Sequence, residues 1–200
     1  MKKILLSASL LAMLFSCQSE DSKVIAENNA AQRQCASQEV LERQLREDPE
    51  MALRMNKIEE FTENFTKNNP NYRLVNGKIE IPVVVNVLYR TTAENISLAQ
   101  IQSQIDVLNK DFNATNSDYG QVPALFSGVK ANVGISFVLD QVIRKSTTKT
   151  SWGTADAMKK TNRGGLAPIT PTTKLNLWVC TIGGGILGYA QFPGGASATD

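Results

Sequence analysis

The stretch that decides the fold runs from Ile79 to Tyr89 and reads IEIPVVVNVLY. β-Branched residues dominate it, and such a run predicts a strand that becomes buried on both faces towards its end. Ser97 and Gln100 follow at the spacing of a helix capping box. Apolar side chains then recur at steps of three and four residues, at Leu98, Ile101, Ile105, Leu108 and Phe112. The sequence therefore predicts a buried strand followed by an amphipathic helix.

Three more strands are expected further along the chain. Residues 134–143 alternate between apolar and polar side chains, and residues 175–180 read LNLWVC. Residues 186–192 are expected to return beside 175–180 as a hairpin, with the glycines at 183–185 as its turn rather than as a phosphate-binding loop. The fold class is therefore α/β (α+β), a mixed twisted sheet with a backing helix. Because one helix cannot cover both faces of such a sheet, we expect the domain to be incomplete within these residues.

A separate helical region is predicted over residues 37–67. Its apolar residues recur at helical steps, Ser37 can cap its start, and Pro49 is expected to divide it into two helices. The region is too small to form its own core, so its apolar stripe must dock on another part of the protein. Turn-forming residues between 68 and 77 mark the boundary with the strand region.

The start of the chain resembles that of a bacterial lipoprotein. Residues 1–16 have the charged start and the short apolar run of a signal peptide, and the run is too short to span a bilayer. Leu14-Phe15-Ser16-Cys17 is similar to a lipobox, in which Cys17 would be acylated. The alternative is an ordinary signal peptide followed by a chance cysteine. Residues 17–34 are polar and are expected to form a flexible tether, with a Ser-Glu-Asp stretch that is similar to an outer-membrane export signal.

The amino-acid composition limits the kinds of catalytic, metal-binding and nucleic-acid-binding site that these residues can form. The 200 residues contain no histidine, so they cannot complete a histidine-based catalytic relay or a histidine zinc site. The net charge is +2, and no basic cluster indicates nucleic-acid binding. An oxidising compartment favours a disulfide between Cys35 and Cys180, whereas their polar and apolar surroundings favour two free thiols. In the second case Arg33 would favour the thiolate of Cys35, which is the form that binds metals.

Three blocks of sequence resemble the pappalysin family of metzincin zinc peptidases, of the cytophagalysin-like type and in their bacterial lipoprotein form. The first block is Arg33-Gln34-Cys35 with Glu39 and Asp48-Pro49, which is similar to the short propeptide of that family. The second block is the strand at 81–89 with the helix at 96–113. The third and most specific block comprises LNLWVC at 175–180 and GGILGYAQFPGG at 184–195.

The resemblance implies a division of the chain and a set of site residues. The division is a lipoprotein signal peptide at 1–16, a tether at 17–34, a helical propeptide at 35–75 and the truncated N-terminal subdomain of a metallopeptidase catalytic domain at 76–200. Cys35 would be the thiolate that blocks zinc in the latent enzyme. The substrate-binding strand would comprise Leu187, Gly188, Tyr189 and Ala190. Zinc ligands and catalytic residues are expected beyond Asp200, because the family's H-E-x-x-H-x-x-G-x-x-H helix is absent, and calcium is a further candidate cofactor.

We therefore expect a zinc-dependent endopeptidase precursor that is inactive as these 200 residues alone. It would act on protein or peptide substrates, bind no nucleic acid, and be an outer-membrane lipoprotein at the cell surface or a secreted protein. The alternative is a non-catalytic surface lipoprotein that binds extended peptides or partners along an exposed strand edge. A zinc-helix motif in the gene soon after the codon for Asp200 would favour the enzyme.

Overall fold

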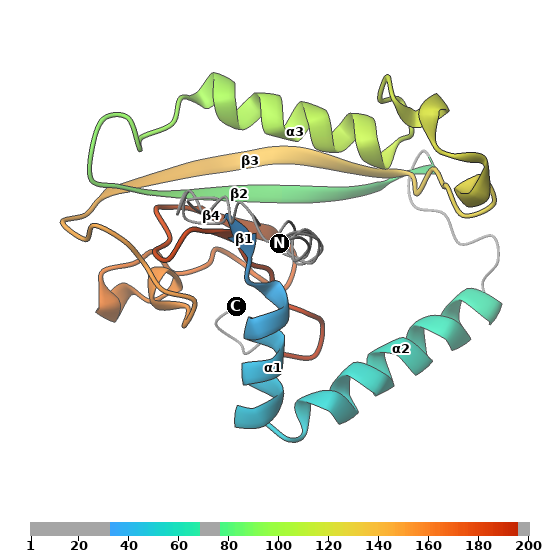
Figure 1. Cartoon of the computed structure of the whole chain (residues 1–200), viewed down its shortest axis with the longest axis horizontal. Coiled ribbons are helices and arrows are strands. Elements are labelled where there is room, and N and C mark those ends of the chain that lie inside the picture. Colours follow the sequence, from blue (N-terminus) through green and yellow to red (C-terminus); the bar gives the residue numbers. More distant parts are fainter. Residues whose placement is uncertain (1–32, 69–76, 196–200) are drawn as a thin grey trace, which may run out of the picture. The chain divides into compact units, whose positions relative to one another are not determined.

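The computed structural model describes residues 33–68 and 77–195 (Figure 1). Their helices and strands are β1 (Gln34–Cys35), α1 (Ser37–Glu47), α2 (Met51–Asn68), β2 (Ile79–Tyr89), α3 (Leu98–Phe112), β3 (Ile135–Ser146), β4 (Leu175–Val179) and β5 (Ile186–Gly188). Short 3₁₀ turns are η2 (Tyr119–Gln121), η3 (Ala124–Phe126), η4 (Ala157–Lys159) and η5 (Thr161–Arg163). Among these residues, no helix has both the length and the hydropathy needed to cross a membrane. The predicted signal peptide at 1–16 and the predicted lipid site at Cys17 lie outside the described residues.

Strand β2 is the centre of a parallel sheet with the order β3-β2-β4. β3 pairs along the whole of β2 on one side, and β4 pairs with Val83–Val87 on the other. Every residue from Val83 to Leu88 is buried, because strands flank both edges of β2 and side chains cover both of its faces. The prediction of a strand over residues 79–89, buried on both faces towards its end, is confirmed.

Helix α3 covers one face of this sheet (Figure 1). Three alternate residues of β2, Val83, Val85 and Val87, form a buried core with Ile101 and Ile105 of the helix. The alternation arises because successive side chains of a strand point to opposite faces. The predicted backing helix and its apolar stripe are therefore confirmed.

Polar side chains fix α3 at its start and against the edge strand β3. The Ser97 hydroxyl accepts a hydrogen bond from Gln100 N at 3.1 Å, as the capping-box spacing predicts. Near the other end, Asn109 Nδ2 donates to Phe137 O at 2.9 Å, and Asn109 Oδ1 accepts from Phe137 N at 2.6 Å. The Asn109 amide thus pairs both backbone groups of one β3 residue and ties the sheet edge to the helix.

The opposite face of the sheet is covered by the loop between β3 and β4. Leu88 packs there against Trp152 and Met158 in a second buried cluster. Trp178 joins the cluster, and its Nε1 donates to Leu166 O at 2.9 Å. The two tryptophans are packing residues, and the loop supplies the second covering layer that a single helix could not.

The predicted hairpin of the last two strands is wrong. β5 forms no ladder with β4 among the described residues, and it pairs in parallel with β1 instead. Gly184 and Gly185 have φ values of +73° and +74°, a conformation that favours glycine, and they turn the chain away from β4. Before the turn, Ile182 forms a bridge with Trp152, so the chain already follows the covering loop. The α/β fold class itself is confirmed.

The predicted helical region is present as two helices, α1 and α2, which are separated at Pro49 as expected. Ser37 is not the helix cap: Ala36 holds that position and no side chain caps the helix. The apolar stripe docks only through its first half, since Val40 and Met51 are buried but Phe61 is 67% exposed.

Candidate functional site at the β5 edge

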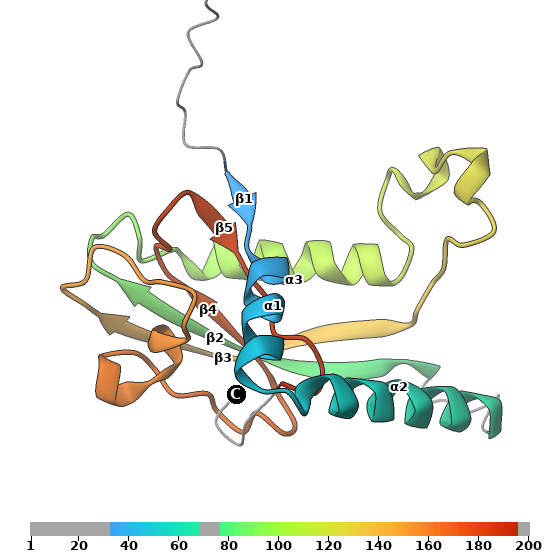
Figure 2. The ribbon, with the colours of Figure 1, turned by 60° about the horizontal axis from the view of Figure 1, so that its bottom comes forward.

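The candidate site is the edge of β5, where residues 34–37 lie against it (Figure 2). Gln34 N donates to Gly185 O at 3.3 Å, and Ala36 N donates to Gly188 O at 3.0 Å. These bonds use only backbone groups, so the same edge can pair with extended segments of many sequences. The strand predicted to bind substrates is thus already occupied by a segment of its own chain.

The register changes within this short ladder. Gln34 lies opposite Ile186, whereas Cys35 lies opposite Gly188, so Leu187 has no partner residue in β1. The Leu187 side chain is 67% exposed. β5 therefore presents a bulged edge, a feature that re-aims side chains and is common next to binding sites.

Cys35 is exposed at the end of β1, and its thiol is free. Its Sγ lies 3.3 Å from Ser37 Oγ, and the same Ser37 Oγ accepts a hydrogen bond from Ala190 N at 3.0 Å. Hydrogen bonding by the Ser37 hydroxyl, and then by the Ser37 backbone N–H, lowers the pKa of the Cys35 thiol from its ordinary value. The sequence favours Arg33 as the cause of a lowered Cys35 pKa, whereas in the structure the cause is Ser37.

Three side chains from α1 and α2 hold these helices against segments that are distant in sequence. Arg43 Nη2 donates to Thr154 O at 2.7 Å, and its Nη1 donates to Thr154 Oγ1 at 3.2 Å. Gln44 Nε2 donates to Gln191 Oε1 at 2.8 Å. The third contact is the hydrogen bond from Arg54 Nε to Gly194 O, at 2.8 Å. We call these three residues the helical anchors.

Gly194 allows the last of these contacts. Its φ is +94°, and a Cβ at this position would lie 2.9 Å from Met55 Cγ and 3.0 Å from Met55 N. Any side chain would therefore be strained by the backbone conformation and would press on the backbone of α2. The described chain after β5 thus fits closely against the start of α2.

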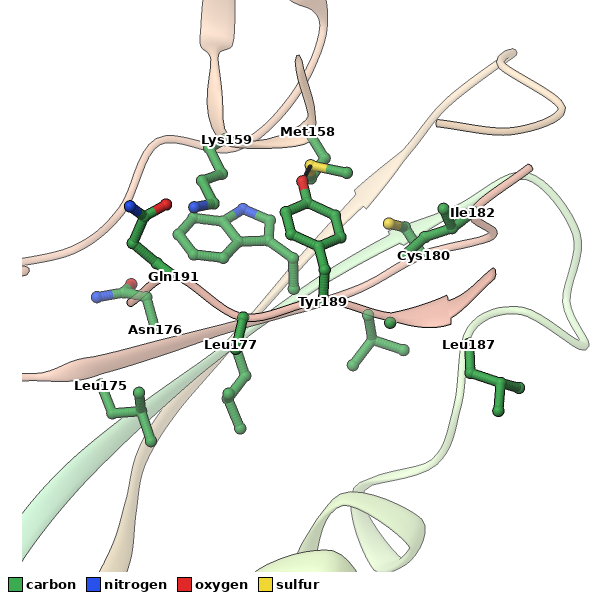
Figure 3. A pocket seen from close by; sticks show the side chains of 14 residues that line it. Met158, Lys159, Leu175, Asn176, Leu177, Cys180, Ile182, Leu187, Tyr189 and Gln191 are labelled. Carbon is green, nitrogen blue, oxygen red and sulfur yellow. Dashed lines mark hydrogen bonds between the residues drawn. The ribbon is translucent and has the colours of Figure 1, made fainter. Parts of the chain in front are cut away.

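A cavity of about 500 Å³ separates β4 from residues 187–191 (Figure 3). Tyr189 lies in its wall, and the Tyr189 hydroxyl donates to Asp156 Oδ1 at 2.8 Å. Lys159 Nζ forms an ion pair with the same carboxylate at 3.2 Å. Burial of the phenol and the neighbouring Asp156 raise the pKa of Tyr189 far above its ordinary value. Tyr189 is therefore a neutral anchor that ties the segment after β5 to the covering loop.

The two described cysteines, Cys35 and Cys180, should differ strongly in reactivity. Burial raises the pKa of the Cys180 thiol to about 11, whereas the pKa of the exposed Cys35 thiol is lowered. At pH 8 only about one Cys180 in a thousand would be a thiolate, which is the reactive form. We expect a short iodoacetamide treatment at pH 8 to label Cys35 and to spare Cys180, as measured by peptide mass spectrometry. Raising the pH towards 11 should increase labelling of Cys180, and equal labelling at pH 8 or an intact Cys35–Cys180 disulfide would contradict this.

The described residues do not form a metal site by themselves. Within residues 33–68 and 77–195, no three His, Cys, Asp or Glu side chains come together as metal ligands. The whole sequence has no histidine, so Cys35 offers a sulfur donor that no imidazole donor accompanies. A zinc ion would need further ligands from other residues.

The sequence predicts roles for Cys35 and residues 187–190 but not the contacts that join them. It favours Ser37 as a helix cap and predicts no role for Arg43, Arg54 or Gly194. Arg43 and its partner are 111 positions apart, and Ser37 and Ala190 are 153 apart. No local pattern reports contacts between such distant residues, although the paired glycines at 194–195 were a visible sign of close packing.

Comparison with known proteins gives solved structures only. No family model matches the chain, and no curated protein matches it. A Tannerella forsythia promirolysin mutant is 36% identical over 81% of this chain and 55% of its own, with a TM-score of 0.65. Mature Tannerella forsythia mirolysin in complex with a cleaved peptide is 40% identical over 59% of this chain and 48% of its own, with a TM-score of 0.56. Mirolysin in complex with compound 9 is 40% identical over 57% of this chain and 47% of its own, with a TM-score of 0.55.

Mirolysin is a metzincin-type metallopeptidase, so the chain resembles a metzincin-like protease, and its α/β fold is similar to that of promirolysin. The chain spans about half the length of these solved chains.

Proposed function

We propose that this chain is the N-terminal part of a zinc-dependent endopeptidase precursor of the pappalysin family. Residues 35–75 would be its propeptide, and residues 76–200 would be the first part of its catalytic domain. The observation that carries the proposal is the pairing of residues 34–37 with the β5 edge. The match to promirolysin supports it, because it covers 81% of this chain, against 59% for mature mirolysin.

The pairing suggests how latency would arise. A strand edge binds an extended peptide through its free backbone groups, and Gly185 O, Gly188 O and Ala190 N already have partners in residues 34–37. A substrate could therefore pair with residues 187–190 only after this segment has left. The complex of mature mirolysin with a cleaved peptide supports peptides as the substrate class.

Cys35 would provide the second element of latency. Its exposed sulfur, held at the end of β1, is suited to bind one coordination position of zinc in place of water. The other zinc ligands would come from residues outside these 200, and the hydrolytic chemistry would belong to that zinc site. The residues described here would position the propeptide and, after its removal, the substrate.

The proposal also includes the membrane anchor and the substrates of the whole protein. Acylation of Cys17 would anchor the precursor at the outer membrane after removal of residues 1–16, with residues 17–34 as the tether. Proteins or peptides would be the substrates.

The proposal is tested by comparing this chain with the longer product of its gene. We expect the 200 residues alone to show no cleavage of a peptide library. The longer product should cleave it after propeptide removal, and a zinc chelator should stop this cleavage. Chelator-sensitive cleavage by the 200 residues, or a processed longer product that binds peptides without cleaving them, would overturn it. The second outcome would favour a peptide-binding surface protein.

A further inference from the structure

We infer that Ser37 is a positioning residue that replaces the last backbone hydrogen bond between β1 and β5 and, through the same hydroxyl, fixes the place of Cys35 on that edge. The inference deepens the proposed function, and its link to latency rests on it. The hydrogen-bond replacement itself stands on the described residues alone.

The argument begins with the geometry of a parallel ladder. In such a ladder the N–H of a residue donates to the C=O of a residue in the neighbouring strand. The C=O of the same residue then accepts from the N–H that lies two positions further along that neighbouring strand. Ala36 N donates to Gly188 O at 3.0 Å, so the regular ladder would pair Ala36 O with Ala190 N. That bond is not formed. Ala36 O accepts from Val40 N at 3.0 Å instead, because α1 begins at the next residue.

The start of α1 would thus leave Ala190 N without a partner. Ser37 Oγ accepts from Ala190 N at 3.0 Å and restores the lost bond with a side-chain oxygen. The chain can therefore change from strand to helix at Ser37 without losing a hydrogen bond to the edge. Ala36 O bonds to Val40 N inside the helix, and the Ser37 hydroxyl oxygen is the acceptor that meets Ala190 N instead.

The Ser37 hydroxyl also contacts the Cys35 thiol. A serine hydroxyl has one proton and two lone pairs, so Ser37 Oγ can accept from Ala190 N and still make a hydrogen bond with Cys35 Sγ, 3.3 Å away. Ala190 of the edge, Ser37 and Cys35 are therefore connected through one oxygen atom. Loss of this oxygen would free the Cys35 sulfur from its fixed position beside β5. The hydrogen bond from Ala36 N to Gly188 O would remain.

Amide hydrogen exchange, measured by NMR on this chain, tests the replacement directly. In Ser37→Ala the Ala190 amide should exchange roughly two- to tenfold faster, which corresponds to one net hydrogen bond. Alanine favours helix, so α1 should be retained and buried β2 amides should keep their exchange rates. Ser37→Thr keeps the hydroxyl and should retain slow exchange at Ala190. Ser103→Ala is the matched control, because its hydroxyl bonds only to Gln100 O within α3.

Unchanged exchange at Ala190 in Ser37→Ala would overturn the inference, as would equal acceleration at every amide or loss of protection in Ser37→Thr. The link to Cys35 is tested in the longer precursor. There Ser37→Ala should shorten the latent period, and it should have little further effect when Cys35 is already replaced by alanine. Fully additive effects would show that Ser37 does not act through Cys35. Because the exchange experiment uses no zinc and no substrate, an inactive longer product would overturn the proposed function without touching the hydrogen-bond result.

Discussion

Replacing Cys35 by alanine in the longer precursor should shorten the period before self-processing on the order of tenfold, equivalent to ~1.4 kcal/mol of lost stabilisation of the latent state. The substitution removes the only sulfur that β1 presents, at an exposed position where no packing is lost. The three helical anchors and the β1–β5 backbone bonds would remain, so the propeptide should still bind but should no longer hold the metal. The measurement is the time course of propeptide release, followed by gel electrophoresis at several protein concentrations.

Cys180→Ala is the matched control for this experiment. Cys180 packs against the cluster that contains Leu88 and forms no disulfide with Cys35, so its replacement should leave the latent period unchanged. An unaltered latent period in Cys35→Ala would contradict the role assigned to this thiol. A Cys35–Cys180 disulfide in the secreted precursor would contradict it independently, because both sulfurs would then be consumed.

The largest expected loss of stability follows from Leu88→Ala in β2. Leu88 is 2% exposed and packs against Trp152 and Met158, beneath the loop that covers the second face of the sheet. Truncation removes several buried methyl and methylene groups and leaves a cavity between two tryptophan-containing segments, which should cost about 2–5 kcal/mol. The free energy of unfolding, measured by urea titration of this chain and followed by tryptophan fluorescence, checks the value.

The same substitution at an exposed leucine is the matched control, because it removes the same atoms without removing buried contacts. Leu125 is 86% exposed in η3, so Leu125→Ala should change the free energy of unfolding by no more than about 0.5 kcal/mol. Equal losses for Leu88→Ala and Leu125→Ala would contradict the assigned packing of the covering loop. A small loss for Leu88→Ala alone would mean that this loop can collapse into the vacated space.

The central strand and its helix could be predicted from the sequence because their signals are local. The β-branched run of β2 and the three- and four-residue steps of α3 depend on neighbouring positions, and so does the cap formed by Ser97. Pro49 likewise divided the first helical region where expected, because proline disturbs only the turn around it. The apolar residues of such elements have to be buried whichever segment covers them, so these elements can be predicted without knowledge of their partners.

The pairing of β5 could not be predicted in the same way. Its apolar residues and the preceding glycines are typical of a hairpin, and they carry no information on which edge the strand will meet. Two positive φ values and the bridge from Ile182 to Trp152 direct β5 away from β4 and towards β1. Ser37 was misread for a related reason: a serine at a helix start usually caps that helix, yet here its oxygen is taken by Ala190 N.

The sequence by itself determined the local elements of this protein and pointed to Cys35 and residues 187–190 as candidates, because propensity, periodicity and residue chemistry act over short distances. Only the tertiary structure decided that the thiol and the strand meet, and that Ser37, Arg43, Gln44 and Arg54 hold the segment in place. Those contacts join residues more than a hundred positions apart, and their free energy depends on how the folded backbone brings each donor to its acceptor.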